Sequence, residues 1–125
     1  TLAALALART DDRDVVASSF DDRLLDVLAV RRPGLARAAI LEVGDSLAPA
    51  LGRARRRGDR AVHLPLRTVL SQPSDVAAAI DLQVRVWTVN RIVDARLCAL
   101  LGVQAVITDL PAQLAQRLRV SGAAA

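Results

Sequence analysis

The chain has 125 residues, of which 53% are hydrophobic, and a formal net charge of +4. This length corresponds to one domain or to part of a larger one, and the apolar content is enough for a sizeable core. No apolar run is long enough to span a bilayer and no secretory signal is recognisable, so we expect a cytoplasmic protein without a transmembrane segment. Because Thr1 is not a start methionine, we also expect upstream sequence.

Blocks of apolar residues alternate with turn signals and predict an initial helix over Leu2–Arg9 followed by five strand–helix units. The predicted strands are Asp14–Ser19, Ala38–Val43, Arg60–Leu64, Val84–Val89 and Ala105–Thr108. The predicted helices begin at Asp21 or Asp22, Leu47, Ser74, Asn90 and Asp109, where Asp, Ser and Asn act as caps, and Pro111 lies in the first turn of the last helix. We assign residues 1–120 to one folded portion and residues 121–125 to a disordered tail.

The order of these elements predicts an α/β fold. Short loops and nearly continuous apolar strands are typical of a parallel sheet that is covered by helices. No glycine-rich dinucleotide fingerprint follows any strand, which argues against a Rossmann fold. A (β/α)8 barrel fits better but needs eight units. We therefore predict a partial TIM barrel of about five parallel units, completed by a missing N-terminal half or by a homo-oligomer.

The basic residues are unusual in composition and in placement. All 17 are Arg, and five of them lie between Arg53 and Arg60. Such a cluster either contacts phosphates or offsets the dipole at the end of a helix. The absence of interleaved aromatic residues favours the second interpretation, so we expect no nucleic-acid partner. The single cysteine, Cys98, lies in an apolar helical pattern and is predicted to be a buried structural thiol.

Few polar residues have the pattern of a catalytic site. The only histidine, His63, lies beside a strand end, where a structural role is commoner than acid–base catalysis. Glu42 interrupts the apolar run of the second strand, and we expect it either to face a polar lumen or to pair with an Arg. Asp45 and Asp109 are explained as helix caps. We therefore assign no catalytic residue and no metal ligand to this chain.

Trp87 is the strongest candidate for ligand binding. Alternation along its strand places Arg85 and Trp87 on one face and the aliphatic Val84 and Val86 on the other. Val84 and Val86 suit packing against outer helices, which turns Trp87 toward the lumen near the C-terminal mouth, where barrel enzymes bind substrates. A plain core tryptophan remains the alternative.

Two motifs carry a resemblance to a known family. The first is Trp87-Thr88-Val89-Asn90, and the second, one helix later, is the run Gly102–Pro111, which contains Ile107-Thr108-Asp109. Together they resemble the C-terminal end of the glycerophosphodiester phosphodiesterase family. The pair Ser19-Phe20 resembles the end of strand four in that family. Asp81 departs from the pattern, since the family usually has glycine there, but Asp tolerates the left-handed conformation comparatively well.

The resemblance implies that the chain supplies strands 4–8 of a barrel that hydrolyses glycerophosphodiesters to glycerol 3-phosphate and an alcohol. It implies that Trp87 and Phe20 line the pocket for the glycerol part of the substrate. The intact enzyme would use a divalent metal such as Ca2+ or Mg2+, but the family's His-Arg-Gly, Glu-x-Asp and further His and Glu motifs do not occur in this chain. We therefore expect no cofactor in this chain and no activity from it alone.

Two other functions remain open. The first is a non-catalytic partial barrel that binds a ligand or assembles with a partner through Trp87 and Phe20. The second is a different barrel enzyme whose site has no recognisable motif.

Overall fold

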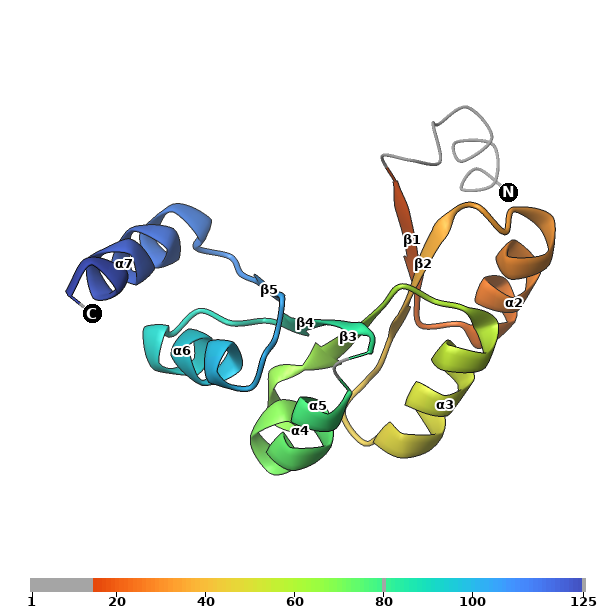
Figure 1. Ribbon diagram of the computed structural model, residues 1–125, viewed down its shortest axis with the longest axis horizontal. Coiled ribbons are helices and arrows are strands. Elements are labelled where there is room, and N and C mark those ends of the chain that lie inside the picture. Colours follow the sequence, from red (N-terminus) through yellow and green to blue (C-terminus); the bar gives the residue numbers. More distant parts are fainter. Residues whose placement is uncertain (1–14, 80, 125) are drawn as a thin grey trace.

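The computed structural model describes residues 15–79 and 81–124, so the helix predicted over Leu2–Arg9 lies outside the described residues. The described part contains five strands and six helices, with one helix after each strand except β3, which is followed by two (Figure 1). The strands are β1 (Val16–Ser19), β2 (Ala36–Ile40), β3 (Ala61–Pro65), β4 (Gln83–Trp87) and β5 (Ala105–Ile107). The helices are α2 (Asp22–Arg31), α3 (Leu47–Arg57), α4 (Leu66–Ser71), α5 (Pro73–Ala78), α6 (Ile92–Leu100) and α7 (Pro111–Ala124).

The five strands form one parallel sheet in the order β1-β2-β3-β4-β5. Strands that pair in chain order, each joined to the next by a helix, are the arrangement of a TIM barrel rather than of a doubly wound sheet. The sheet is open, and in Figure 1 the helices fan around one side of it. The prediction of a partial TIM barrel with about five βα units is therefore confirmed.

The two faces of the sheet differ in what covers them. On β4, Val84 and Val86 are buried within the main hydrophobic cluster, whereas Arg85 and Trp87 alternate with them and remain partly exposed. This alternation places Arg85 and Trp87 on the inner face, which would line the lumen of a closed barrel, as predicted. The register places Ala61 of β3 beside Ala38 of β2, so this face carries alanines nearer the strand starts.

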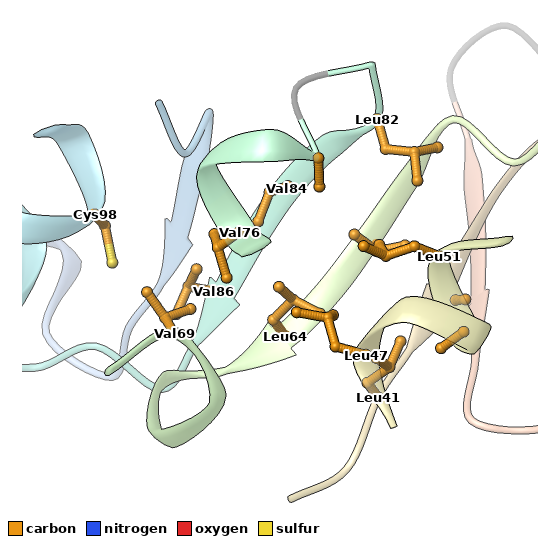
Figure 2. Packing of buried hydrophobic residues seen from close by; sticks show 14 of the residues in the cluster. Leu41, Leu47, Leu51, Leu64, Val69, Val76, Leu82, Val84, Val86 and Cys98 are labelled. Carbon is orange, nitrogen blue, oxygen red and sulfur yellow. The ribbon is translucent and has the colours of Figure 1, made fainter. Parts of the chain in front are cut away.

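The core lies between the outer face of the sheet and the helices. Val62 and Leu64 of β3 are fully buried within the main hydrophobic cluster. Figure 2 shows Leu64 between α3, which carries Leu47, and the short helices α4 and α5, which carry Val69 and Val76. The helices contribute aliphatic side chains that also have almost no exposed surface: Leu47, Leu51, Val69 and Val76. Cys98 of α6 is a buried free thiol, as predicted. Burial of apolar area on this one face is the main source of stability.

The helix boundaries agree only in part with the sequence-based expectations. α3 has the predicted bounds, because Gly58 ends it in the left-handed conformation at a φ of 80°. The short helix α4 was missed, since six residues give too little periodicity to detect. The prediction that Ser74 caps α5 is wrong, because α5 begins one residue earlier, at Pro73. α7 includes residues 121–124, which the sequence analysis assigns to the tail.

The start of β2 was also missed because Arg37 interrupts its apolar pattern. Its guanidinium is buried: Nε donates to Asp59 Oδ1 at 3.1 Å, and Nη2 donates to the Arg57 carbonyl oxygen at 2.9 Å. The Asp59 carboxylate also accepts from Arg57, whose Nη2 lies 2.7 Å from Oδ2. Burial alone would lower the pKa of Arg57, but hydrogen bonds to Asp59 and Asp26 outweigh it and raise that pKa above its usual value.

The arginine cluster at the end of α3 is therefore occupied mainly in ion pairs that join elements. Arg57 reaches Asp22 and Asp26 of α2, and Arg53 also pairs with Asp22. Arg55 makes a two-point contact with Asp81, the residue that departs from the family pattern. These contacts connect α3 to α2 and to the loop before β4. Arg55, Arg56 and Arg57 also lie in the last turn of α3, the position where cations offset the helix dipole.

Replacing Asp59 is expected to destabilise the fold strongly. Asp59→Ala leaves the buried guanidinium groups of Arg37 and Arg57 without their shared carboxylate, which costs about 3 kcal/mol. The measurement is urea unfolding followed by circular dichroism. Asp81→Ala is the matched control, because it removes an exposed ion pair and should change the unfolding midpoint little. Equal effects of the two substitutions would contradict the assignment of the buried network.

Candidate functional site

The two predicted site residues come together at the carboxyl ends of the strands. Phe20 directly follows β1, and Trp87 is the last residue of β4. Their ring centroids lie 6.3 Å apart with an interplanar angle of 89°, an edge-to-face contact. Since β2 and β3 lie between these strands, a flat sheet would separate β1 from β4 by about 14 Å at the usual strand spacing. The contact is therefore favoured by curvature of the sheet, and it places both rings at the rim of the inner face.

The pair combines an exposed ring with a partly buried one. Phe20 is 57% exposed. The indole of Trp87 is half-buried, and its Nε1 is enclosed without a hydrogen-bond acceptor among the described residues. The peptide bond between Trp87 and Thr88 is cis. The rim thus presents aromatic surface, and the indole N–H of Trp87 is buried behind it.

Below Trp87 the inner face is polar. His63 of β3 pairs in register with Arg85 of β4, and Arg85 Nη1 lies 3.3 Å from His63 Nε2. Arg85 Nη2 donates to Gln83 Oε1 at 3.0 Å. Burial, followed by the positive charge of Arg85, lowers the pKa of His63, so the imidazole is neutral at pH 7. His63 therefore lies on the inner face, one residue pair below the rim, beside a cation.

Two cavities lie at the carboxyl end of β2, next to the loop that follows this strand. One of 460 Å³ is lined by Phe20, Asp22, Glu42, Asp45, Ser46, Pro49 and Arg53. Another of 620 Å³ lies against the loop after β2 and the start of α3 on one side and α4 on the other. Glu42 is exposed, lies just after the end of β2 and lines the smaller of these cavities. Asp45 does not cap α3; its Oδ2 accepts from the backbone N–H of Glu42 at 2.9 Å and closes the intervening turn.

The carboxylates and His63 do not converge on a cation. Within residues 15–79 and 81–124, no three side chains of His, Cys, Asp or Glu lie in a group that would hold a metal ion. The described residues therefore do not fit the divalent cation that the family resemblance implies.

Asn90 has a different role from the predicted one. The N-cap position of α6 belongs to Arg91, and the prediction that Asn90 caps this helix is wrong. Its side-chain amide instead reaches the loop after β5, where it contacts Thr108 and Asp109. The two sequence motifs are therefore joined by hydrogen bonds. The only signal of this in the sequence is that the motifs occur together.

His63 is expected to titrate below its usual pKa of about 6.5. Because the folded state disfavours the imidazolium, stability is fully present above pH 6.5 and falls as the pH drops from there toward the folded-state pKa. As His63 is the only histidine, an NMR titration of its ring protons measures this directly. Arg85→Gln should raise the pKa, and Arg91→Gln is the control. An unchanged pKa in Arg85→Gln would contradict the contact.

The comparisons with known proteins bear on the fold. No protein-family model matches the chain, and no curated protein matches it by sequence. Several solved structures match well. A putative glycerophosphodiester phosphodiesterase from Galdieria sulphuraria superposes with a TM-score of 0.77 at 18% identity, over 94% of this chain and 49% of that one. A putative glycerophosphoryl diester phosphodiesterase from Silicibacter pomeroyi matches at 27% identity with a TM-score of 0.72, over 86% of this chain and 38% of that one.

A third match is a phosphodiesterase from Oleispira antarctica, solved in complex with the product sn-glycerol-3-phosphate. It shares 21% identity with this chain at a TM-score of 0.67, over 83% of this chain and 41% of that one. The chain thus spans less than half the length of these structures. None of the described helices has the length and apolar character needed to cross a membrane. The described part of the chain has the fold of a C-terminal portion of a glycerophosphodiester phosphodiesterase barrel.

Proposed function

We propose that this chain is the pocket-forming portion of a barrel enzyme that hydrolyses glycerophosphodiesters to glycerol 3-phosphate and an alcohol. The observation that carries the proposal is the contact of Phe20 with Trp87 at the carboxyl rim of a sheet with the fold of solved phosphodiesterases. Ligands of barrel enzymes bind at this end of the strands. The Oleispira antarctica structure, with its bound sn-glycerol-3-phosphate, supports the choice of ligand.

The chemistry of the rim suits such a ligand. The carbon chain of glycerol has apolar C–H groups that pack against aromatic rings such as those of Phe20 and Trp87. Arg85 contacts the uncharged groups of His63 and Gln83, so its positive charge is not neutralised by a described carboxylate. A phosphate group carries the opposite charge, and Arg85 attracts it toward the inner face.

Cleavage needs groups that the described residues do not bring together. A phosphodiester is hydrolysed when its oxygens are neutralised and protons move to and from the attacking and leaving oxygens. The family resemblance assigns these tasks to a Ca2+ or Mg2+ ion and to a pair of histidines. In this proposal they belong to an N-terminal part of the barrel, and the intact protein acts in the cytoplasm.

The isolated chain is expected to bind sn-glycerol 3-phosphate but not to hydrolyse glycerophosphocholine. Binding should change the fluorescence of Trp87, the only tryptophan, because the ligand displaces water at the rim. The measurements are a fluorescence titration and an assay for released choline with added Ca2+. Phe20→Ala should weaken binding about threefold to tenfold, as expected for the loss of an aromatic contact.

Val30→Ala is the matched control for that substitution, because Val30 is an exposed apolar residue on α2. Turnover that a chelator abolishes would show that the chain contains its own catalytic residues. A fluorescence signal that is unchanged up to millimolar ligand would contradict the proposed pocket.

A second function, that of a non-catalytic assembly module, is favoured by the exposed apolar residues at the rim. Phe20, Ile107 and Leu110 have exposed fractions of 57%, 42% and 41%. Exposed apolar surface of this kind favours association. If the chain assembles with itself, light scattering should give a mass of at least twice 13.3 kDa. A monomer at all concentrations would exclude a homo-oligomer.

A further inference from the structure

The side chain of Asn90 joins the loop after β4 to the loop after β5. Its Oδ1 accepts from Thr108 Oγ1 at 2.8 Å and from the backbone N–H of Asp109 at 3.0 Å. Its Nδ2 donates to Asp109 Oδ2 at 3.1 Å. Thr108 Oγ1 in turn accepts from the backbone N–H of Leu110 at 3.0 Å. Both functional atoms of the amide are thus used, and all of its partners lie on the neighbouring loop.

This contact begins where the backbone pairing of the two strands ends. Trp87 pairs with Ile107 at the end of the sheet, and Val89 N donates to the Ile107 carbonyl oxygen at 2.9 Å. One residue later the Asn90 amide continues the connection between the loops. The segment that carries Trp87 is therefore held by the sheet at one end and by Asn90 at the other.

We propose that Asn90 is a positioning residue, which keeps Trp87 at the rim by fastening the two loops together. That Trp87 serves a ligand rests on the proposed function, but the fastening itself does not. The position requires an amide, because the side chain must accept from a hydroxyl and an N–H while it donates to a carboxylate. A carboxylate in the same place would face Asp109 with a like charge.

The first test is Asn90→Ala in the 125-residue chain, well below its melting temperature. Acrylamide quenching of Trp87 should increase about twofold, and exchange of the Asp109 amide proton should be about tenfold faster, as expected for the loss of several hydrogen bonds. Gln116→Ala, which removes an exposed amide from α7, is the matched control. If Asn90→Ala lowers only the melting temperature, while quenching and exchange match the original chain, the proposal is wrong.

The second test is Asn90→Asp, which keeps the acceptor and removes the donor. At pH 7 the introduced carboxylate repels Asp109, so quenching and amide protection should resemble those of Asn90→Ala. Below about pH 4, where carboxyl groups gain protons, protonation of one of the two should restore a donor and return both readouts toward the original chain. Asn90→Ala cannot recover in this way. Equal behaviour of the two variants at every pH would overturn the proposal.

Neither test uses a ligand, so their results are independent of the proposed function. A titration of sn-glycerol 3-phosphate into the original chain and into Asn90→Ala adds the functional readout, and binding should weaken about fivefold in the variant, on the scale of one to two hydrogen bonds. If the original chain does not bind sn-glycerol 3-phosphate, the proposed function fails while the fastening of the loops is judged by the first two tests alone.

Discussion

One-sided burial of the parallel sheet is the constraint on which the rest of this structure depends. Alternation along each strand sends one set of side chains under the helices and the other set to the opposite face. On β4 the first set is Val84 and Val86, and the second includes Arg85 and Trp87. Because the core uses only the outer face, the inner face is free to carry polar and aromatic side chains. The candidate site exists for this reason.

The two ends of the strands are stabilised by polar contacts in addition to the apolar core. At the amino ends of the strands, Asp59 is shared by the buried Arg37 and Arg57 and ties β2 to the end of α3. At the carboxyl ends, the amide of Asn90 ties the last two loops together. Both contacts join segments that are distant in sequence, and both depend on side-chain hydrogen bonds in addition to the backbone hydrogen bonds of helices and strands.

Much of the fold could be predicted from the sequence because it depends on local patterns. The apolar runs located all five strands, and Gly58 marked the end of α3 by its need for a positive φ. The inner position of Trp87 followed from the valines that flank it. The start of β2 at Ala36-Arg37 was missed and Asn90 was misread for a shared reason. Arg37 contacts Asp59, and Asn90 contacts the loop at Thr108, only because the tertiary fold brings these segments together. The residues next to Arg37 or Asn90 in the sequence do not indicate whether the side chain is buried or exposed.

The candidate site was predicted in part. The sequence singled out Trp87 and Phe20, but their mutual contact depends on the curvature of a sheet, which no short pattern records. The pairing of His63 with Arg85 depends on the register between β3 and β4. The two sequence motifs are connected by the hydrogen bond from Asn90 to Asp109, which no local pattern in the sequence indicates.

The alanines on the inner face have a consequence for whatever closes the barrel. Ala38 and Ala61 sit side by side there, each with a single methyl group. Closed barrels fill their interior with layers of bulky branched side chains contributed by alternate strands. In a barrel completed on this sheet, the steric volume near the floor must come from the opposing strands. A larger residue at Ala38 or Ala61 would then compete with those opposing side chains for the same space.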